Sequence, residues 1–506
     1  MLRILITIGA IQFLAILVNL VRSKAVAVLL GPAGVGTISV IDQVVQFAAY
    51  LSAFSLPLAS VKFLSRAHSQ GAEQFRRTFS AFAMLLFVMA AAGTAIVIAL
   101  IAFRPQAFGV TLAKLRIPML VAAASIPAMS MLGFFTNVLA AAQKTRSSAL
   151  LAVVSNSAQT IGVVVGVLAG SILGLYTGTL IMNTVLVAGM LVYLRFALGL
   201  PFGLRVAGFA REMRANRDVF AFSLCLYLAA AAYSFSLLMA RMAILTKLGE
   251  SAAGLLQALI ALSAAIGLVL NPTNGLYLTP IMNRDIPAAV KMRTATEFQK
   301  RLIVLLALVA MPMALFPDVL LETLFSKRFL GAAPYMYLFV TAQCTLQIAG
   351  VYQALLIGLD DLKVYTAFTC AGFGFLGLAA RVLAPRYGMA GVGAAFIGGT
   401  VLLLLLSWFR LKRRFGYSLP PGLRAFMGYT FSVMLVAGAA LGGYRTSDWA
   451  VTAWKGGVYV CFVASLIVFQ GGEERNAIIG LWARFRTTAA SMPLPQGRGS
   501  IPEPPA

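Results

Sequence analysis

Polar and cationic side chains lie inside the first apolar segment of the chain, at intervals that bring several of them together. Gln12, Asn19 and Arg22 are separated by seven and three residues, so they share one face if the segment is helical. Lys24 lies on another side of the same segment. Guanidinium and ammonium groups bind phosphate oxygens. This segment therefore indicates an anion-binding site.

An acidic residue occupies the matching position beyond a turn. Arg22 lies ten residues before Pro32, and Asp42 lies ten residues after it. If the chain reverses near Pro32, both charges lie roughly 12–15 Å below the turn, at a helical rise of 1.5 Å per residue. We therefore expect Arg22 and Asp42 to pair, with Gln43 and Gln46 as supporting polar residues and Asp42 as a possible coupling residue.

Three pairs of similar turns recur at nearly one offset. The turn at Gly31 has a counterpart at Gly249, 218 residues later. Turns near residues 143 and 360 differ by 217, and those at 174 and 388 differ by 214. A repeat of this length holds six membrane helices, and an even number gives both copies the same orientation. Parallel repeats around a central cavity are typical of secondary transporters.

The repeat relates a third cation to the first two. Arg241 lies in another apolar segment, and subtracting 218 gives position 23, between Arg22 and Lys24. Each half thus places a cation at about the same depth. This symmetry predicts that Arg22, Lys24 and Arg241 line one cationic cavity, because charge within a membrane usually faces a cavity or a partner. The alternative is that these long side chains extend to the lipid headgroups.

The segments that carry these residues are continuous apolar stretches. Of the 506 residues, 60% are hydrophobic and 11% are charged, whereas a soluble domain carries roughly 25% charged residues. The stretches lack the alternation of barrel strands, so they predict an all-α polytopic membrane protein with about fourteen transmembrane helices. The predicted spans are 4–30, 34–60, 78–103, 117–142, 147–171, 176–199, 219–247, 253–282, 302–325, 334–358, 364–384, 389–409, 425–444 and 451–470.

The spans and the repeat predict an organisation in four parts. Residues 1–217 form an N-terminal lobe of helices one to six, and residues 218–415 form a C-terminal lobe of helices seven to twelve. Helices thirteen and fourteen occupy residues 416–472. A cytoplasmic tail of residues 473–506 is expected to be disordered from about residue 490, where Pro and Gly are frequent. Pro32 and Pro272 are candidate hinges.

The net charge of +25 raises the question of nucleic-acid binding. The basic residues collect in short connections between spans, and most of them fall on one side, which is the pattern of cytoplasmic loops. We therefore expect both termini in the cytoplasm and no nucleic-acid partner. Asp360–Asp361 could suggest a metal site of a glycosyltransferase, but the pair lies on a short turn that corresponds to Gln143–Lys144. The sequence predicts no metal, no cofactor and no catalytic residue.

Residues 21–36, with the sequence VRSKAVAVLLGPAGVG, resemble the first helix and turn of Wzx-type polysaccharide flippases. Those for O-antigen and enterobacterial common antigen are the most similar, and they belong to the multidrug/oligosaccharidyl-lipid/polysaccharide exporter (MOP) superfamily. Further similarity lies at residues 139–145, 240–250 and 385–391. One departure is Ala240–Arg241, where many relatives carry Asp-Arg, so Asp42 is the nearest remaining carboxylate for ion coupling.

The resemblance implies a function for the cationic cavity. Such proteins move undecaprenyl-diphosphate-linked oligosaccharide from the cytoplasmic to the periplasmic leaflet of the bacterial inner membrane by alternating access, for surface polysaccharide biosynthesis. Arg22, Lys24 and Arg241 match the charged residues of the family's helices one and seven. Expected partners are the lipid-linked oligosaccharide, membrane lipids, and the polysaccharide polymerase with its chain-length machinery.

Three alternatives remain open at this point. Within the superfamily, these are a lipid II flippase and a drug or cation antiporter. A membrane-embedded polysaccharide polymerase or ligase is the alternative of another class, although such enzymes typically carry a large periplasmic loop. The longest connection on that side, residues 104–116, is about a dozen residues long.

Overall fold

The computed structural model describes residues 2–54, 56–104, 113–142, 144–200, 218–273, 278–282 and 286–469. All regular structure in these ranges is helical. The elements are α1 (Leu2–Ala53), α2 (Leu56–Gln70), α3 (Ala72–Phe103), α5 (Arg116–Ala124), α6 (Ile126–Ala141), α7 (Thr145–Leu198), α9 (Asp218–Leu248), α10 (Glu250–Thr273), α11 (Thr279–Met282), α12 (Ala288–Leu315), α13 (Pro317–Leu324), the 3-10 segment η3 (Lys327–Tyr335), α14 (Met336–Gly358), α15 (Leu362–Phe415), α16 (Pro421–Leu441) and α17 (Trp449–Phe469). The predicted tail, residues 473–506, lies outside the described residues.

Three of the long helices reverse direction at residues with non-helical backbone angles. In α1 the break is Gly31 with φ +65°, in α7 it is Gly170–Ser171, and in α15 it is Gly388 with φ +57°. Glycine adopts positive φ without the steric cost of a Cβ atom. Within the described ranges, eleven helices are long and apolar enough to cross a membrane. Because three of these contain a reversal, the described residues form fourteen crossing segments, which agrees with the predicted number of about fourteen.

The segment boundaries differ from the prediction in several places. In the predicted span 253–282, α10 ends at Thr273, and in the predicted span 302–325, α12 ends at Leu315 before the separate helix α13. The predicted span 34–60 ends at Ala53, and Phe54, with φ +49°, turns the chain into the separate helix α2. The predicted span 117–142 consists of α5 and α6, which meet at Ser125. Pro127 explains this break, because proline lacks the N–H that would continue α5 and is favoured in the first turn of a new helix.

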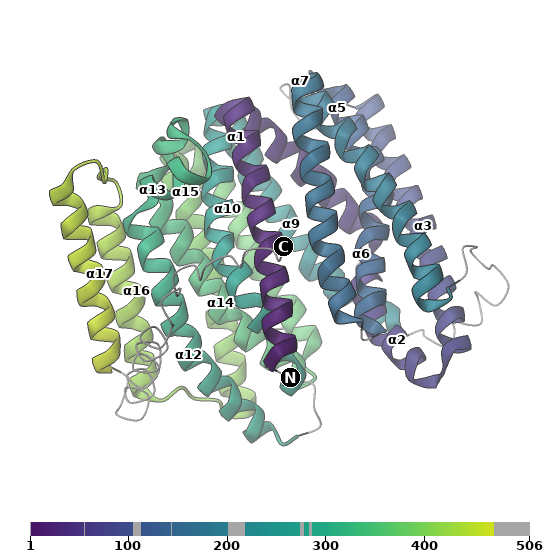
Figure 1. Ribbon diagram of the computed structural model, residues 1–506. Coiled ribbons are helices and arrows are strands. Elements are labelled where there is room, and N and C mark those ends of the chain that lie inside the picture. Colours follow the sequence, from purple (N-terminus) through teal and green to yellow (C-terminus); the bar gives the residue numbers. More distant parts are fainter. Residues whose placement is uncertain are drawn as a thin grey trace, which may run out of the picture.

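The helices form two groups that meet along α1 and α9. In Figure 1, α3, α5, α6 and α7 lie together on one side, α10, α12, α14 and α15 lie on the other, and α16 and α17 lie beyond α12 at the far edge. The predicted boundary near residue 217 falls outside the described residues. The division into 1–217, 218–415 and 416–472 remains a prediction, and the spatial grouping follows the same order along the chain.

Glycines allow very close helix packing within and between the groups. In the hairpin of α7, Gly162 faces the backbone of Gly178, and Gly166 faces that of Gly174; a Cβ at any of them would collide with the opposite helix. Gly36 of α1 is in the same close contact with the α10 backbone at Glu250. At this point α1 and α10 therefore meet through backbone atoms, which small residues permit in membrane proteins.

A buried charge pair attaches α17 to the rest of the bundle. Lys455 is 0% exposed; its Nζ donates to the Tyr444 carbonyl at 2.7 Å and lies 3.7 Å from Asp318 of α13. Asp318 also accepts hydrogen bonds from the backbone N–H and the hydroxyl of Thr446. These contacts hold the connection between α16 and α17 against α13.

The glycine contacts within α7 lead to a first prediction. Gly174→Val should force the two halves of α7 apart and lower the stability of the purified protein by about 1–3 kcal/mol, the usual cost of overpacking. Thermal unfolding in detergent measures the effect. Gly189→Val is the matched control, because the space around Gly189 is open. An equal loss of stability in both variants would contradict the proposed role of close packing.

The short turn between α14 and α15 carries the acidic pair of residues 360 and 361. Arg410 Nε lies 2.9 Å and Arg414 Nη1 lies 2.8 Å from the Asp361 carboxylate. Burial of Asp361 opposes its ionisation, but the hydrogen bonds and charges of the two arginines outweigh burial and hold the pKa of Asp361 below its ordinary value. The carboxylate thus ties this turn to the end of α15.

A pH dependence follows from the lowered pKa of Asp361. A carboxyl group with a lower pKa in the folded state stabilises the fold above its ordinary pKa of about 3.9 and loses this contribution as the pH falls through the folded-state value. Asp361→Asn should therefore lower the free energy of unfolding at pH 7 by less than about 1 kcal/mol, because both arginines are partly exposed. Its stability, measured by unfolding at several pH values, should converge with that of wild type in acid. Asp360→Asn is the control, and a pH-independent loss in Asp361→Asn would refute the assignment.

Candidate functional site

A cavity of about 380 Å³ lies where α1 faces both helix groups. Its lining comes from both halves of α1, from the α5–α6 junction and α7, from α9 and α10, and from the turn after α13. Its hydrophobic lining includes Val26, Val35 and Phe325. Its charged, amide and phenolic lining residues are Arg22, Asp42, Gln46, Gln159, Tyr176, Asn183, Arg241 and Gln257.

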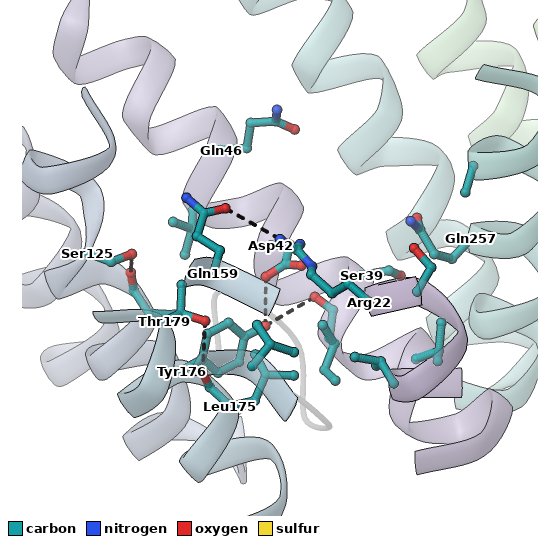
Figure 2. A pocket seen from close by; sticks show the side chains of 18 of the residues that line it. Arg22, Ser39, Asp42, Gln46, Ser125, Gln159, Leu175, Tyr176, Thr179 and Gln257 are labelled. Carbon is teal, nitrogen blue, oxygen red and sulfur yellow. Dashed lines mark hydrogen bonds between the residues drawn. The ribbon is translucent and has the colours of Figure 1, made fainter. Parts of the chain in front are cut away.

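Arg22 and Asp42 face this cavity from the two halves of the α1 hairpin. Figure 2 shows both side chains directed into the same space, with Tyr176 beside Asp42. The Tyr176 hydroxyl donates to Asp42 Oδ1 at 2.9 Å, and Arg22 Nη1 donates a long hydrogen bond of 3.5 Å to Gln159 Oε1. The reversal at Gly31 therefore brings both charges to one cavity. The expected ion pair between Arg22 and Asp42 is not among the described contacts, because each side chain binds a neutral partner of its own.

Arg241 of α9 is the most buried cation of the cavity, with 7% of its surface exposed. Its Nη1 donates to the Ser39 carbonyl at 3.2 Å and to Gln43 Oε1, and its Nη2 donates to Gln257 Oε1 at 2.6 Å. Its Nε is buried and has no hydrogen-bond partner within the described part of the chain. Its hydrogen-bond partners in the described structure are all neutral oxygens, and no carboxylate there lies within ion-pair distance of it.

Gln43 determines how Arg241 is held. It is 1% exposed, and its amide nitrogen donates to both the carbonyl and the hydroxyl oxygen of Ser234, at 3.1 and 2.9 Å. These bonds orient the amide so that its oxygen faces the guanidinium. The contact joins α1 to α9, while Gln257 joins α9 to α10. Arg241 is thus fixed between three helices without loss of its positive charge.

The other predicted site residues have different positions. Lys24 is not part of the cavity lining; its Nζ donates to the Thr323 carbonyl of α13 at 2.7 Å. Gln46 lines the cavity, whereas Asn19 is half-buried outside it, and the Gln12 side chain is not among those described.

The two hinge candidates lie at helix breaks or ends. Pro32 directly follows the positive-φ Gly31 at the reversal of α1. Pro272 lies in the last turn of α10, which ends at Thr273, and its side chain is not among those described. A hinge role for either proline remains a prediction.

Sequence reasoning missed part of the cavity wall on α7. Tyr176 was not singled out because the turn was expected at residues 173–175, whereas the chain reverses at Gly170–Ser171. Tyr176 is therefore five residues inside the next helix, at a depth where it reaches Asp42. Gln159, Asn183 and Gln257 are polar residues within predicted spans, but nothing in their spacing distinguishes a cavity position from an interhelical hydrogen bond.

The arrangement is suited to binding an anion. Two guanidinium groups, one carboxylate and several amide groups line a small, partly open cavity. Its excess of one positive charge, with Arg241 buried and in no direct ion pair, favours an anionic ligand, because electrostatic attraction is strong at low dielectric. Among the described residues there is no cluster of three or more His, Cys, Asp or Glu side chains that could hold a metal ion.

Comparison with known proteins identifies the fold. No protein-family model matches the sequence, and no curated protein matches it. The lipid II flippase MurJ in an inward closed conformation superposes with a TM-score of 0.67 at 12% identity, over 90% of this chain and 98% of that one. An inward-facing MATE multidrug transporter of the MOP superfamily gives 0.60 at 11% identity, over 84% and 99%.

A third solved structure comes from Pyrococcus furiosus. This MOP-superfamily transporter, described as having a binding pocket of reverse polarity, gives a TM-score of 0.60 at 13% identity, over 85% of this chain and 95% of that one. These likenesses show that the chain has the fold of MOP-superfamily transporters. The function of this chain is therefore argued from the cavity.

The excess positive charge of the cavity, which has two guanidinium groups and one carboxylate, can be probed with inorganic pyrophosphate. Binding to the folded state should raise the thermal unfolding midpoint of the wild-type protein by about 1–3 °C when pyrophosphate exceeds its dissociation constant. Arg241→Gln and Arg22→Gln should each remove most of this shift, since both take a cation from the cavity. Lys412→Gln, an exposed cation at the end of α15, is the control. Equal shifts in all four proteins would place the anion elsewhere.

Proposed function

We propose that this protein is a flippase for undecaprenyl-diphosphate-linked oligosaccharide. It moves the lipid-linked glycan from the cytoplasmic to the periplasmic leaflet of the bacterial inner membrane by alternating access, with both termini in the cytoplasm. The product serves surface polysaccharide biosynthesis, such as that of O-antigen or exopolysaccharide. Its expected functional partners are the polysaccharide polymerase and chain-length proteins, which act on the delivered glycan.

One observation carries this proposal: Arg241 is a buried guanidinium held only by neutral oxygens. A carboxylate partner would have neutralised the guanidinium charge within the protein. Neutral carbonyl and amide oxygens instead satisfy hydrogen bonds and leave the cation free to attract a ligand. With Arg22 also lining the cavity, the site presents two cations to one anionic group, which fits a diphosphate better than a single carboxylate or an uncharged lipid.

The same observation weighs against a drug or cation antiporter. A cationic drug requires an excess of negative charge in the cavity, whereas this cavity has two guanidinium groups and one carboxylate. That carboxylate, Asp42, is already bound by Tyr176. In this proposal Asp42 is the candidate for ion coupling, since it is the acidic group that faces the cavity.

A lipid II flippase is the second candidate. The overall fold matches MurJ over nearly its whole length, and a cationic cavity suits any polyprenyl diphosphate headgroup. The two functions differ in the attached glycan and not in the anchoring chemistry. The polymerase or ligase alternative has less support, because the solved structures with this fold that are described above are transporters.

A leaflet-specific assay tests the proposal. Depleting the protein in its own bacterium should cause an undecaprenyl-linked oligosaccharide to accumulate on the cytoplasmic side, and restoring the wild-type gene should clear it. Arg22→Gln and Arg241→Gln should each reduce translocation about tenfold or more, because each removes a charge-assisted hydrogen bond from the headgroup. Gln353→Leu, an amide in α14 outside the cavity, should restore transport.

The identity of the accumulated lipid separates the two candidates. Accumulation of lipid II in place of an oligosaccharide carrier would favour the second. If no undecaprenyl-linked glycan accumulates, or if both arginine variants transport normally, the flippase assignment is wrong.

A further inference from the structure

One wall of the cavity is lined by polar but uncharged side chains. Gln159, Tyr176, Thr179 and Asn183 all come from α7, on both sides of its reversal. Gln159 Nε2 donates to Asn183 Oδ1 at 2.9 Å, and Asn183 is 1% exposed. The buried asparagine therefore fixes the orientation of the glutamine, and the pair forms a rigid part of the wall opposite the helices that hold Arg241.

The cavity supplies hydrogen-bond acceptors that a diphosphate cannot use, on the α7 wall and on the neighbouring part of α1. A diphosphate with its oxygens ionised offers acceptors only, so it matches guanidinium groups and repels a carboxylate. Asp42 is nevertheless exposed to the cavity, and Gln46 and Gln159 add amide groups that both donate and accept. A ligand that satisfies the whole cavity must bring donors as well as an anion, which describes hydroxyl or acetamido groups attached next to the diphosphate.

The present partners of these groups can be exchanged for such a ligand. The hydrogen bond from Arg22 to Gln159 is 3.5 Å long and therefore weak. When Arg22 binds a phosphate oxygen, Gln159 Oε1 loses this donor and can accept from a sugar hydroxyl instead. The two events occur side by side, because Arg22 and Gln159 are already neighbours in Figure 2.

The size of the cavity limits how much of the glycan it can recognise. Its volume of about 380 Å³ is near the lower end of the range of about 300–1,000 Å³ for small-molecule sites. This space suits a diphosphate with one sugar, and because the cavity is partly open, further sugars would extend out of it. The lining residues would therefore contact the unit bonded directly to the diphosphate.

We propose that the α7 wall, through Gln159 and Asn183 together with Gln46 of α1, selects lipid diphosphates that carry a sugar and reads the hydroxyl or acetamido groups of that first sugar. This inference rests on the proposed function, since it assumes that a lipid diphosphate enters the cavity. It adds specificity-determining residues that contact no phosphate. Their role is separable from that of Arg22 and Arg241, which bind the anion whatever is attached to it.

Binding of paired lipids to the purified full-length protein tests the inference. The probes are undecaprenyl diphosphate and the same lipid bearing a single glucose, galactose or N-acetylglucosamine. Wild type should bind at least one of the sugar-bearing lipids about two- to tenfold more tightly than undecaprenyl diphosphate, the range of one or two net hydrogen bonds. Gln159→Leu and Gln46→Leu should abolish this preference while keeping the affinity for undecaprenyl diphosphate. Gln353→Leu should leave both unchanged.

The outcomes distinguish this inference from the proposed function. If wild type binds none of the four lipids, the proposed function fails. If it binds all four equally, or if the preference survives in both glutamine variants, the α7 wall does not read the sugar and the inference is wrong, while the diphosphate site stands. Arg241→Gln should weaken the four lipids alike. Because Asn183 is buried, lipid binding by Asn183→Leu is interpreted only if its unfolding midpoint matches that of wild type. Gln46 is exposed, so Gln46→Leu is the decisive variant.

Discussion

The solvation of one buried guanidinium organises the centre of this protein. Arg241 cannot be moved into an apolar bundle without acceptors for its N–H groups, because an unpaired buried charge costs several kcal/mol. The chain supplies a carbonyl from Ser39 and two amide oxygens, from Gln43 and Gln257. These acceptors come from α1 and α10, so a single side chain of α9 joins three helices at the depth of the cavity.

The choice of neutral acceptors links stability with function. A carboxylate would have solvated Arg241 equally well and would have ended its capacity to attract an anion. Asp42 is the adjacent residue to Gln43 in α1, yet its carboxylate faces the other way and binds Tyr176. The order Asp-Gln at this point of the helix thus directs the negative charge to the α7 side of the cavity and the neutral oxygen to Arg241.

Close backbone contacts allow these short polar bonds to form. Gly36 of α1 meets α10, and the glycines of α7 bring its two halves together. Side chains at these positions would separate the helices, and the amide groups of Gln159 and Asn183, one on each half of α7, could not meet. The polar interior of the cavity therefore depends on the small residues around it, as expected where lipid offers no hydrophobic force to join helices.

The sequence by itself determined the membrane class, the helical fold and the number of crossings, because continuous apolar stretches permit few other structures in lipid. It also identified Arg22, Asp42 and Arg241 as charges within spans, since such residues are costly and seldom accidental. The turn at Gly31 was readable as well, and both Arg22 and Asp42, which lie ten residues on either side of Pro32, line one cavity. The ion pair expected between them is not among the described contacts.

Only the tertiary structure decided which groups these charges contact. Lys24, two residues from Arg22, donates to the Thr323 carbonyl of α13, because a shift of two positions rotates a side chain by more than half a turn of the helix. The α7 wall of the cavity forms because α7 reverses at Gly170–Ser171, a few residues before the expected turn. This reversal brings Gln159 of the first half beside Tyr176 and Asn183 of the second half. Depth along a helix follows from counting residues, whereas the facing of each side chain depends on neighbouring helices that are remote in sequence.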